Sequence, residues 1–257
     1  MASPKVLVLR APGTNCDEET AEAWRRAGAE PQPVHVNRLL ESPSLIADYQ
    51  VLSLPGGFSY GDDLGAGRVL GSQFKQQLAD VCHEFREAGK LVLGICNGFQ
   101  ILLQTGLLDL EDDQGGTATL TWNHHGRYEA RWVHLAVGAT PCVFLSGIES
   151  IELPIAHAEG KFVARDEATL AALQASGRAA LRYVTANGTA ADGFPANPNG
   201  AMGDVAGVCD ASGRVFGLMP HPERFIDATQ HPQWTRRERQ PQGDGLKLFQ
   251  NAVRYLS

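Results

Sequence analysis

A short apolar run, Leu91–Ile95, ends in a cysteine that stands between two glycines, and a helix-like segment follows at once. Strand, sharp turn and helix in this order are typical of a nucleophile elbow, a strained turn that tolerates only small neighbours. Gly94 and Gly98 meet that requirement on either side of Cys96. The unpaired amides of a helix N-terminus also favour the thiolate form of such a cysteine. The alternative is a buried structural thiol, since free cysteines are commonly buried.

The first hundred residues alternate between apolar strand-like segments and helix-like segments. The expected strands are 6–9, 33–36, 51–54 and 91–95. The segment 64–88 is expected to be mainly helical. Short buried strands separated by helices predict a parallel sheet covered on both faces, with its chemistry at the carboxyl ends of the strands. Cys96 and the segment 55–57 each follow such a strand, so both are expected at that edge.

From about residue 117 the pattern changes to strand pairs. A hairpin is expected between segments 117–123 and 127–137, joined by His124, His125 and Gly126. Further strands are expected near 180–185, 204–209 and 215–219, followed by a closing helix over 246–255. With no linker or repeat, the whole chain, 1–257, is expected to form one α/β domain. Its predicted architecture is three-layered, with a mainly parallel central sheet and a small antiparallel sheet from the second half.

Composition narrows the class of protein. With 257 residues, 43% of them hydrophobic, and a net charge of −7, the chain can bury a full core and does not present the charge of a nucleic-acid surface. Five scattered cysteines without a C-x-x-C pair indicate a reducing compartment, and no apolar run is long enough for a membrane span. A cytoplasmic protein is therefore expected. The histidines outside the motifs lack metal-ligand spacing and no phosphate-binding loop occurs, so no metal and no cofactor are predicted in this chain.

A second motif supplies what a thiolate nucleophile needs, a base and a group that orients the base. His221-Pro222-Glu223 follows an apolar strand. In extended backbone the side chains at i and i+2 point the same way, and Pro222 restrains the intervening backbone. His221 is therefore predicted to be the general acid–base, with Glu223 fixing its tautomer. Proton transfer by a positioned side chain contributes about 10²–10⁴-fold to a rate.

The glycine pair after the third expected strand suggests where an oxyanion would be stabilised. Gly56 and Gly57 let backbone N–H groups face a cavity without obstruction by a Cβ atom. The Gly57 region and the Asn97 N–H are predicted to form an oxyanion hole, in which one donor is typically worth about 10²–10³-fold. The alternative interpretation is an ordinary tight turn.

Together these residues resemble the class I glutamine amidotransferases, and the resemblance extends from Val6 to the last helix. The segments that carry it are 56–62, 94–100, 122–123, 131–132, 154–157, 197–200 and 219–224. The resemblance maps the family's Cys–His–Glu triad onto Cys96, His221 and Glu223. It also implies a flavodoxin-like fold.

The resemblance further implies glutamine hydrolysis through a cysteine thioester, with ammonia passed to a separate synthetase subunit that serves purine synthesis. ATP and Mg²⁺ are expected on that subunit, a small accessory subunit is expected to join it, and activity is expected to be weak without them. By family analogy Gln100, one helical turn after the nucleophile, contacts the amino or carboxylate end of glutamine. Asn123 is a candidate for the same task, and its alternative role is that of a turn residue.

Three alternatives stay open at this point. The chain could serve another ammonia-using synthetase, although the segments 56–62 and 197–200 argue against this. It could be a PfpI-like hydrolase or chaperone, but those proteins usually have histidine directly after the cysteine, where Asn97 stands here. It could be an inactive scaffold subunit, which an intact triad disfavours. The polar segment 227–245 is expected to be exposed, and its basic cluster 236–239 is expected to form a solvated face or a docking surface.

Overall fold

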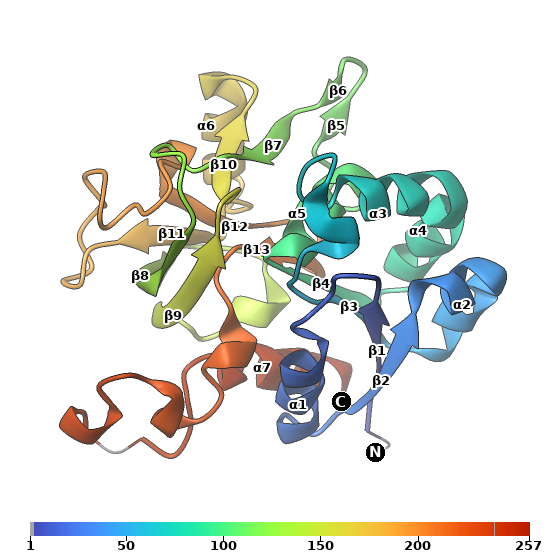
Figure 1. Cartoon of the computed structure of the whole chain (residues 1–257), viewed down its shortest axis with the longest axis horizontal. Helices are drawn as coiled ribbons and strands as arrows, with labels where there is room; N and C mark the ends of the chain where they lie inside the picture. The colour runs from blue at the N-terminus through green and yellow to red at the C-terminus, as the bar shows by residue number, and fades with distance from the viewer. Residues whose placement is uncertain (1–2, 239) are drawn as a thin grey trace.

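The computed structural model describes residues 3–238 and 240–257, and a nine-stranded sheet forms its centre (Figure 1). In order across the sheet, the strands are β2 (Glu30–His35), β1 (Lys5–Arg10), β3 (Val51–Leu54), β4 (Leu91–Ile95), β13 (Val215–Leu218), β12 (Val205–Cys209), β11 (Leu181–Val184), β8 (Glu129–Val137) and β9 (Ser150–His157). The prediction of an α/β protein is confirmed. Arg239, part of the basic cluster considered above, lies outside the described residues.

The sheet has two halves that differ in strand direction. The strands from β2 to β13 run parallel to one another, whereas β12, β11, β8 and β9 are each antiparallel to their neighbours. Every residue of β3, β4, β12 and β13 is buried, as expected of central strands covered on both faces. The antiparallel strands of the second half thus extend the central sheet, and β13 belongs to both halves.

The expected hairpin between segments 117–123 and 127–137 does not form. Instead, β7 (Ala118–Thr121) pairs with β10 (Lys161–Ala164) in a separate two-stranded sheet, and β8 pairs with β9 and β11. The pairing with β9 prevails because it aligns apolar side chains, with Val133 opposite Leu153. A further small sheet joins β5 (Glu111–Asp112) to β6 (Gly115–Gly116).

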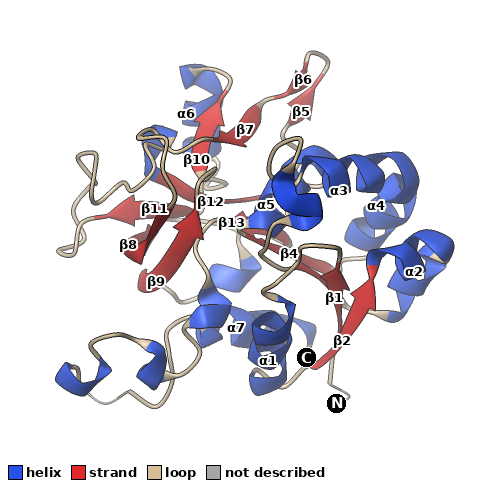
Figure 2. Ribbon diagram, viewed as in Figure 1, coloured by secondary structure: helices blue, strands red, loops and turns tan. Residues whose placement is uncertain are grey.

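Helices cover both faces of the parallel half (Figure 2). On one face α1 (Asp17–Arg26) meets α7 (Leu246–Leu256), and the rings of Trp24 and Phe249 pack edge to face with centroids 5.0 Å apart. The other face carries α3 (Arg68–Gln73), a π-helical turn (Phe74–Leu78), α4 (Ala79–Glu87) and α5 (Asn97–Thr105). The helix expected over 64–88 therefore begins at Arg68 and changes its winding in the middle.

The remaining helical segments are short or peripheral. They are α2 (Val36–Glu41), α6 (Glu167–Ala175) and the 3₁₀ turns Pro43–Asp48, Ser59–Asp62, Val143–Leu145, Met202–Asp204, Pro222–Arg224, Ala228–Gln230 and Trp234–Arg236. Residues 232–238 are exposed, as predicted for this part of the polar excursion. None of the helices within the described residues is long and apolar enough to cross a membrane.

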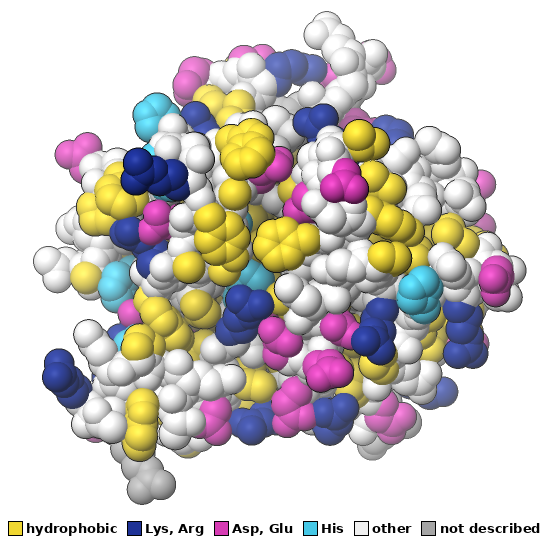
Figure 3. Space-filling model, viewed as in Figure 1, with side chains coloured by type: hydrophobic (Ala, Val, Ile, Leu, Met, Phe, Trp, Pro, Cys, Tyr) yellow, Lys and Arg dark blue, Asp and Glu magenta, His cyan; other side chains and the backbone are white. Residues whose placement is uncertain are grey.

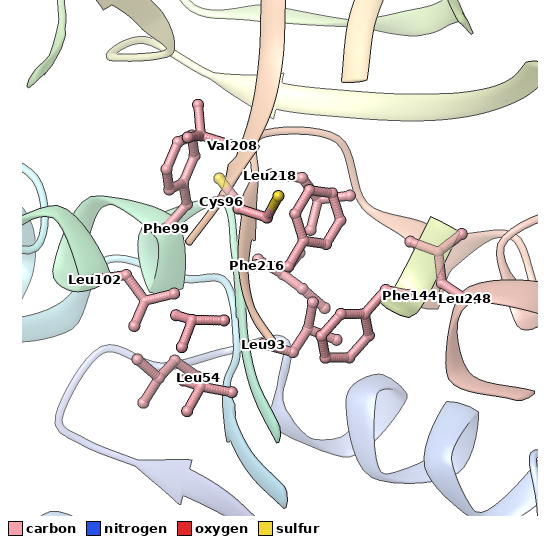
Figure 4. Close-up of a cluster of buried hydrophobic side chains, with 14 of the residues drawn as sticks. Leu54, Leu93, Cys96, Phe99, Leu102, Phe144, Val208, Phe216, Leu218 and Leu248 are labelled. Carbon is pink, nitrogen blue, oxygen red and sulfur yellow. The ribbon is translucent and has the colours of Figure 1, made fainter. Parts of the chain in front are cut away.

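A continuous apolar core supports the edge of the sheet where the predicted site lies. Figure 4 shows Leu54 of β3 with Phe99 and Leu102 of α5 on one face of the sheet, and Leu93 of β4 with Phe216 of β13 on the other face. All five side chains are less than 1% exposed. Because these three adjacent strands are packed on both faces, the positions of their ends relative to one another are fixed by packing.

Candidate active site

The predicted elbow is confirmed. Strand β4 ends at Ile95, α5 begins at Asn97, and Cys96 joins them with φ 52° and ψ −107°. A residue other than glycine held in such a conformation costs about 1–3 kcal/mol and persists only where the surrounding packing imposes it. The Cys96 side chain is 6% exposed, and its Sγ lies 3.8 Å from the carbonyl oxygen of Ala156 on β9.

The two glycines of the elbow allow the helix to pack directly on the sheet. A Cβ atom on Gly98 would lie 1.9 Å from the carbonyl oxygen of Leu54, and one on Gly94 would lie 2.6 Å from the carbonyl oxygen of Gly98. Both distances are far below van der Waals contact. Any side chain at either position would push α5 away from β3 and β4, and would displace Cys96 with it.

His221 and Glu223 form a buried pair just beyond the end of β13. The His221 N–H donates to the carbonyl oxygen of Pro154, 2.8 Å away, and Pro222 begins a 3₁₀ turn that brings the two side chains together. The Nδ1 atom of His221 lies 2.6 Å from Oε1 of Glu223, with exposed fractions of 2% and 0%. An ionised Glu223 accepts this hydrogen bond, which places a proton on Nδ1.

The protonation of His221 is set by opposing effects. Burial is the largest of these and lowers its pKa, but the negative charges of Glu223 and Cys96 and short-range contacts with the sulfurs of Cys16 and Cys96 raise it. The net result is a pKa well above the usual value, so the imidazolium form is favoured. A cationic ring beside a cysteine is the arrangement that supports a thiolate.

The sheet register brings the elbow and the histidine together. Leu218, the last residue of β13, pairs with Ile95 at the end of β4, and the Cys96 N–H donates to the carbonyl oxygen of Leu218 at 2.8 Å. A Cβ atom on Gly56 would lie 2.9 Å from Cε1 of His221 and 3.5 Å from Cβ of Cys96. The side chains of Cys96 and His221, which the sequence predicted to lie close together, therefore both pack against Gly56, where there is no room for a Cβ atom.

The segment around Gly57 is held by the loop between β1 and α1. The Phe58 N–H donates to the carbonyl oxygen of Gly13 at 2.9 Å, and the Cys16 N–H donates to that of Gly56 at 3.3 Å. Gly57 has φ +146°, and a Cβ there would lie 2.8 Å from Asn15 N. Gly57 and Cys96 line the same small cavity, of about 40 Å³.

The predicted oxyanion hole stays a prediction. Gly57 lines this cavity, whereas Asn97 is not among its lining residues; Asn97 is the first helical residue of α5, where a backbone N–H has no acceptor within the helix. The Asn97 side chain also ties this edge together, because its Oδ1 accepts from the Ser59 N–H at 3.1 Å and its Nδ2 donates to Oδ1 of Asp62 at 3.1 Å.

The far end of the cavity is polar. Gln100 lines it; its Oε1 accepts from Asn97 Nδ2 at 3.0 Å and its Nε2 donates to the carbonyl oxygen of Glu159 at 2.6 Å. Asp62 and Glu159 line it as well. Burial raises the pKa of Asp62, and the charge of Glu159 adds to this effect. Hydrogen bonds from the Gly67 backbone and the Asn97 side chain lower the same pKa but do not cancel the increase. The sequence interpretation did not single out either carboxylate. Asp62 ends the segment 56–62 that carries the family resemblance, and that signal could have found it.

Asn123 is buried and lies behind the cavity. Its Nδ2 donates to the carbonyl oxygens of Arg127 and His157 at 2.9 and 2.8 Å, and its Oδ1 accepts from the Gly160 N–H and from Nδ1 of His157, both at 3.1 Å. Burial lowers the pKa of His157 to about 3, so the ring is neutral and donates from Nδ1. The Asn123 amide is thus fully engaged in holding the turn after β9.

Two other features of the molecule bear on the location of the site. One group of three side chains that could hold a metal ion occurs among the described residues: Cys16, His221 and Glu223, whose possible ligand atoms lie within 4.8 Å of one another. The predicted absence of a metal stays a prediction. A wider hollow of about 710 Å³ is lined by residues between Phe225 and Asp244 and contains no thiol. The small cavity, in contrast, is lined by Cys96. A cysteine elbow with a buried histidine–carboxylate pair, on the carboxyl edge of a parallel sheet, is the arrangement of the triad enzymes, the class that the sequence resemblance also indicates.

Comparisons with known proteins agree with this class. The CobB/CobQ-like glutamine amidotransferase domain matches residues 3–256. The PurQ subunit of phosphoribosylformylglycinamidine synthase from Dehalococcoides mccartyi is 46% identical over 256 residues, covering 99% of this chain and 98% of the relative. The corresponding subunit of Methanococcus maripaludis is 42% identical over 267 residues, covering 99% and 98%. The solved structure of PurLQS from Thermotoga maritima contains a chain that superposes with a TM-score of 0.75 at 34% identity over the full length of both chains. The chain belongs to the CobB/CobQ-like glutamine amidotransferase family and, within it, to the PurQ group.

Proposed function

We propose that this protein is the glutaminase subunit of phosphoribosylformylglycinamidine synthase. It hydrolyses glutamine through a cysteine thioester and delivers ammonia to an ATP-dependent synthetase subunit for de novo purine synthesis. The observation that carries the proposal is the convergence of Cys96 and the buried His221–Glu223 pair on Gly56, in a chain that matches PurQ relatives over nearly its full length.

The chemistry follows from the positions of the three side chains. The Cys96 thiolate attacks the carboxamide carbon of glutamine, and the N–H groups of Gly57 and Asn97 stabilise the resulting oxyanion. His221 gives its proton to the leaving nitrogen, the C–N bond breaks, and ammonia departs from the thioester. His221 then takes a proton from water, whose oxygen attacks the thioester carbon and releases glutamate and the thiolate. Glu223 holds the imidazole throughout.

The polar end of the cavity suits the head of a glutamine molecule. Gln100 provides a carboxamide, and the carboxylates of Asp62 and Glu159 provide negative charge for the α-ammonium group. Asn123 contributes by holding the turn that carries Glu159, since its own amide is engaged. The cavity volume of about 40 Å³ is close to the space of one water molecule, about 30 Å³. The walls must therefore separate for glutamine to enter, which supports weak activity in the isolated subunit.

We assign the partner roles to a PurL synthetase subunit and a small PurS subunit, with ATP and Mg²⁺ bound by PurL. The similar PurLQS structure supports this assignment, and so does the lack of a phosphate-binding loop in this sequence. Hydrophobic side chains also gather in the middle of the face shown in Figure 3, among the ends of β9 and α5. Phe58 lines the cavity and is 44% exposed, while Trp122 and Tyr128 are more than half exposed. The cytoplasm is the proposed compartment.

Ammonia release from glutamine tests the proposal. Wild type and Cys96→Ala would each be assayed alone and with PurL, PurS, ATP and the formylglycinamide substrate. Wild-type release is expected to rise at least about tenfold with the partners, whereas the variant releases no ammonia in either setting. Supplying ammonium chloride should restore synthesis with the variant, which shows that the synthetase subunit is active and that the variant lacks only ammonia release. Unchanged ammonia release by Cys96→Ala would contradict the assigned nucleophile.

A further inference from the structure

A second thiol lies against the same imidazole that serves Cys96. Cys16 precedes α1 and is 1% exposed. Its Sγ lies within 4.8 Å of a ring nitrogen of His221 and of a carboxylate oxygen of Glu223. A Cβ atom on Gly56 would lie 3.1 Å from Sγ of Cys16, 2.9 Å from Cε1 of His221 and 3.5 Å from Cβ of Cys96. The two cysteine side chains therefore border one histidine ring at one point in the fold, although they come from loops at opposite ends of the β1–β4 segment.

The position of Cys16 is fixed on several sides. Nη2 of Arg224 donates to its Sγ at 3.0 Å, and Oδ1 of Asn15 lies 3.3 Å from the same sulfur. The carbonyl oxygen of Cys16 accepts from both the backbone N–H and the hydroxyl of Thr20, at 3.1 and 2.6 Å. Arg224 is itself held by Oε1 of Glu19 at 3.4 Å. A thiol anchored this firmly can restrain a ring that packs against it.

A contact between Cys16 and the His221 ring would restrain the side of the ring that carries Nε2. Nδ1 is bound to Glu223, whereas Nε2 is buried and makes no directed hydrogen bond within the described residues. The titratable groups that interact with the ring electrostatically are Cys16, Cys96, Glu223, His157 and Tyr128, and Arg224 interacts with Cys16 and Glu223. Burial lowers the pKa of His221, and the contacts with Cys16 and Cys96 are among the effects that raise it. A sulfur accepts a hydrogen bond from imidazolium only weakly, but burial strengthens the interaction.

We propose that Cys16 is a positioning residue of the glutaminase reaction. Its thiol, anchored by Arg224, holds the His221 ring in place beside Cys96 and stabilises the imidazolium form of that ring. Cys16 forms no bond to substrate and transfers no proton. The inference rests on the proposed function, because it assumes that Cys96 and His221 are the working pair.

Alkylation of Cys96 by iodoacetamide, followed over a range of pH in the full chain, tests the role without the partner subunits. Mass spectrometry of the peptide containing Cys96 would give its rate separately from the other cysteines. Near pH 7, Cys16→Ala is expected to alkylate Cys96 about tenfold more slowly than wild type, the worth of one hydrogen bond to a charged group. Near pH 10 the two rates are expected to converge, because a thiol then ionises without help.

Two further variants sharpen the experiment. Cys16→Ser keeps a hydrogen-bond acceptor at the site, so its rate is expected to return to within about threefold of wild type. Cys82→Ala removes a buried thiol from α4, away from the site, and should leave the profile unchanged. A wild-type rate in Cys16→Ala near neutral pH would overturn the inference, and so would an equal slowing at every pH. Failure of Cys96 to react at any pH in wild type would instead overturn the proposed function.

Discussion

Nδ1 of His221 and Oε1 of Glu223 lie 2.6 Å apart, and neither side chain is more than 2% exposed. The pair sits just past the end of β13, the strand that joins the parallel and antiparallel halves of the sheet. Within the described residues the second carboxylate oxygen, Oε2, has no hydrogen-bond partner. The histidine is therefore the side-chain hydrogen-bond partner of this buried carboxylate among the described residues, and the charge of Glu223 raises the pKa of that ring.

Replacing this charge should impair catalysis. Glu223→Gln keeps the size of the side chain but removes the negative charge that stabilises imidazolium, and its amide can present an N–H to Nδ1. Glutaminase activity in the complete complex is expected to fall about 10²-fold or more. Ammonia release measured at saturating glutamine checks this. Glu22→Gln, an exposed carboxylate on α1, is the matched control and should retain activity; a similar rate in both variants would show that Glu223 does not orient the base.

The elbow depends on the absence of a side chain at Gly98. Gly98→Ala places a Cβ 1.9 Å from the carbonyl oxygen of Leu54, and the backbone on both sides is rigid. The free energy of unfolding is expected to fall by about 3 kcal/mol or more. Urea unfolding measures the loss. Gly138→Ala adds the same methyl group where no atom lies within 4 Å and should be nearly neutral; equal stability of the two variants would mean that α5 can shift away from β3 without cost.

Acid should destabilise the protein through His157. Its pKa falls from 6.5 to about 3 because of burial, so below pH 6.5 the unfolded chain binds a proton that the folded chain refuses. Stability from this group is thus present above pH 6.5 and is lost progressively as the pH falls toward 3. Between pH 6.5 and pH 5 the loss is about 2 kcal/mol.

Comparing how steeply the free energy of unfolding changes with pH in wild type and in a His157 variant separates the contribution of His157 from that of other groups. The free energy of unfolding of wild type and His157→Gln would be measured in urea at several pH values from about 5 to 7. The variant is expected to lose about 2 kcal/mol less than wild type across this range, whatever its absolute stability. Parallel curves for the two proteins would show that His157 takes up a proton in the folded state.

Gln100 and Asn123 should separate into binding and structural roles. Gln100 lines the cavity, so Gln100→Ala is expected to raise the KM for glutamine about tenfold. Asn123→Ala leaves the Gly160 N–H and Nδ1 of His157 without their acceptor, which is expected to cost about 2–3 kcal/mol of stability. Steady-state kinetics and urea unfolding of both variants test the distinction. A raised KM without destabilisation in Asn123→Ala would reverse the second assignment.

Sequence reasoning succeeded where the signal was local. The elbow requires only Gly94, Cys96 and Gly98 in a strand–turn–helix context, and the histidine–carboxylate pair requires only neighbours separated by a proline. It missed what depends on distant pairing. Cys16 reaches the site because the loop after β1 packs along the segment after β3. The residues around position 16 contain no motif that predicts this packing. The expected hairpin was wrong because β8 has apolar partners on β9 that outweigh its nearest neighbour in sequence.

The place of β13 in the sheet has a consequence for synthesis of the chain. This strand is inserted between β4 and β12, although it follows β4 by more than a hundred residues in the sequence and is the last strand among the described residues. Until residues 215–218 emerge, β4 presents an apolar open edge, and open edges of this kind promote aggregation. A chain that ends before this strand would carry the proposed nucleophile without the proposed base. Addition of β13 therefore covers the edge of β4, and the turn that follows it brings His221 to Cys96, so the same part of the chain completes both the sheet and the proposed triad.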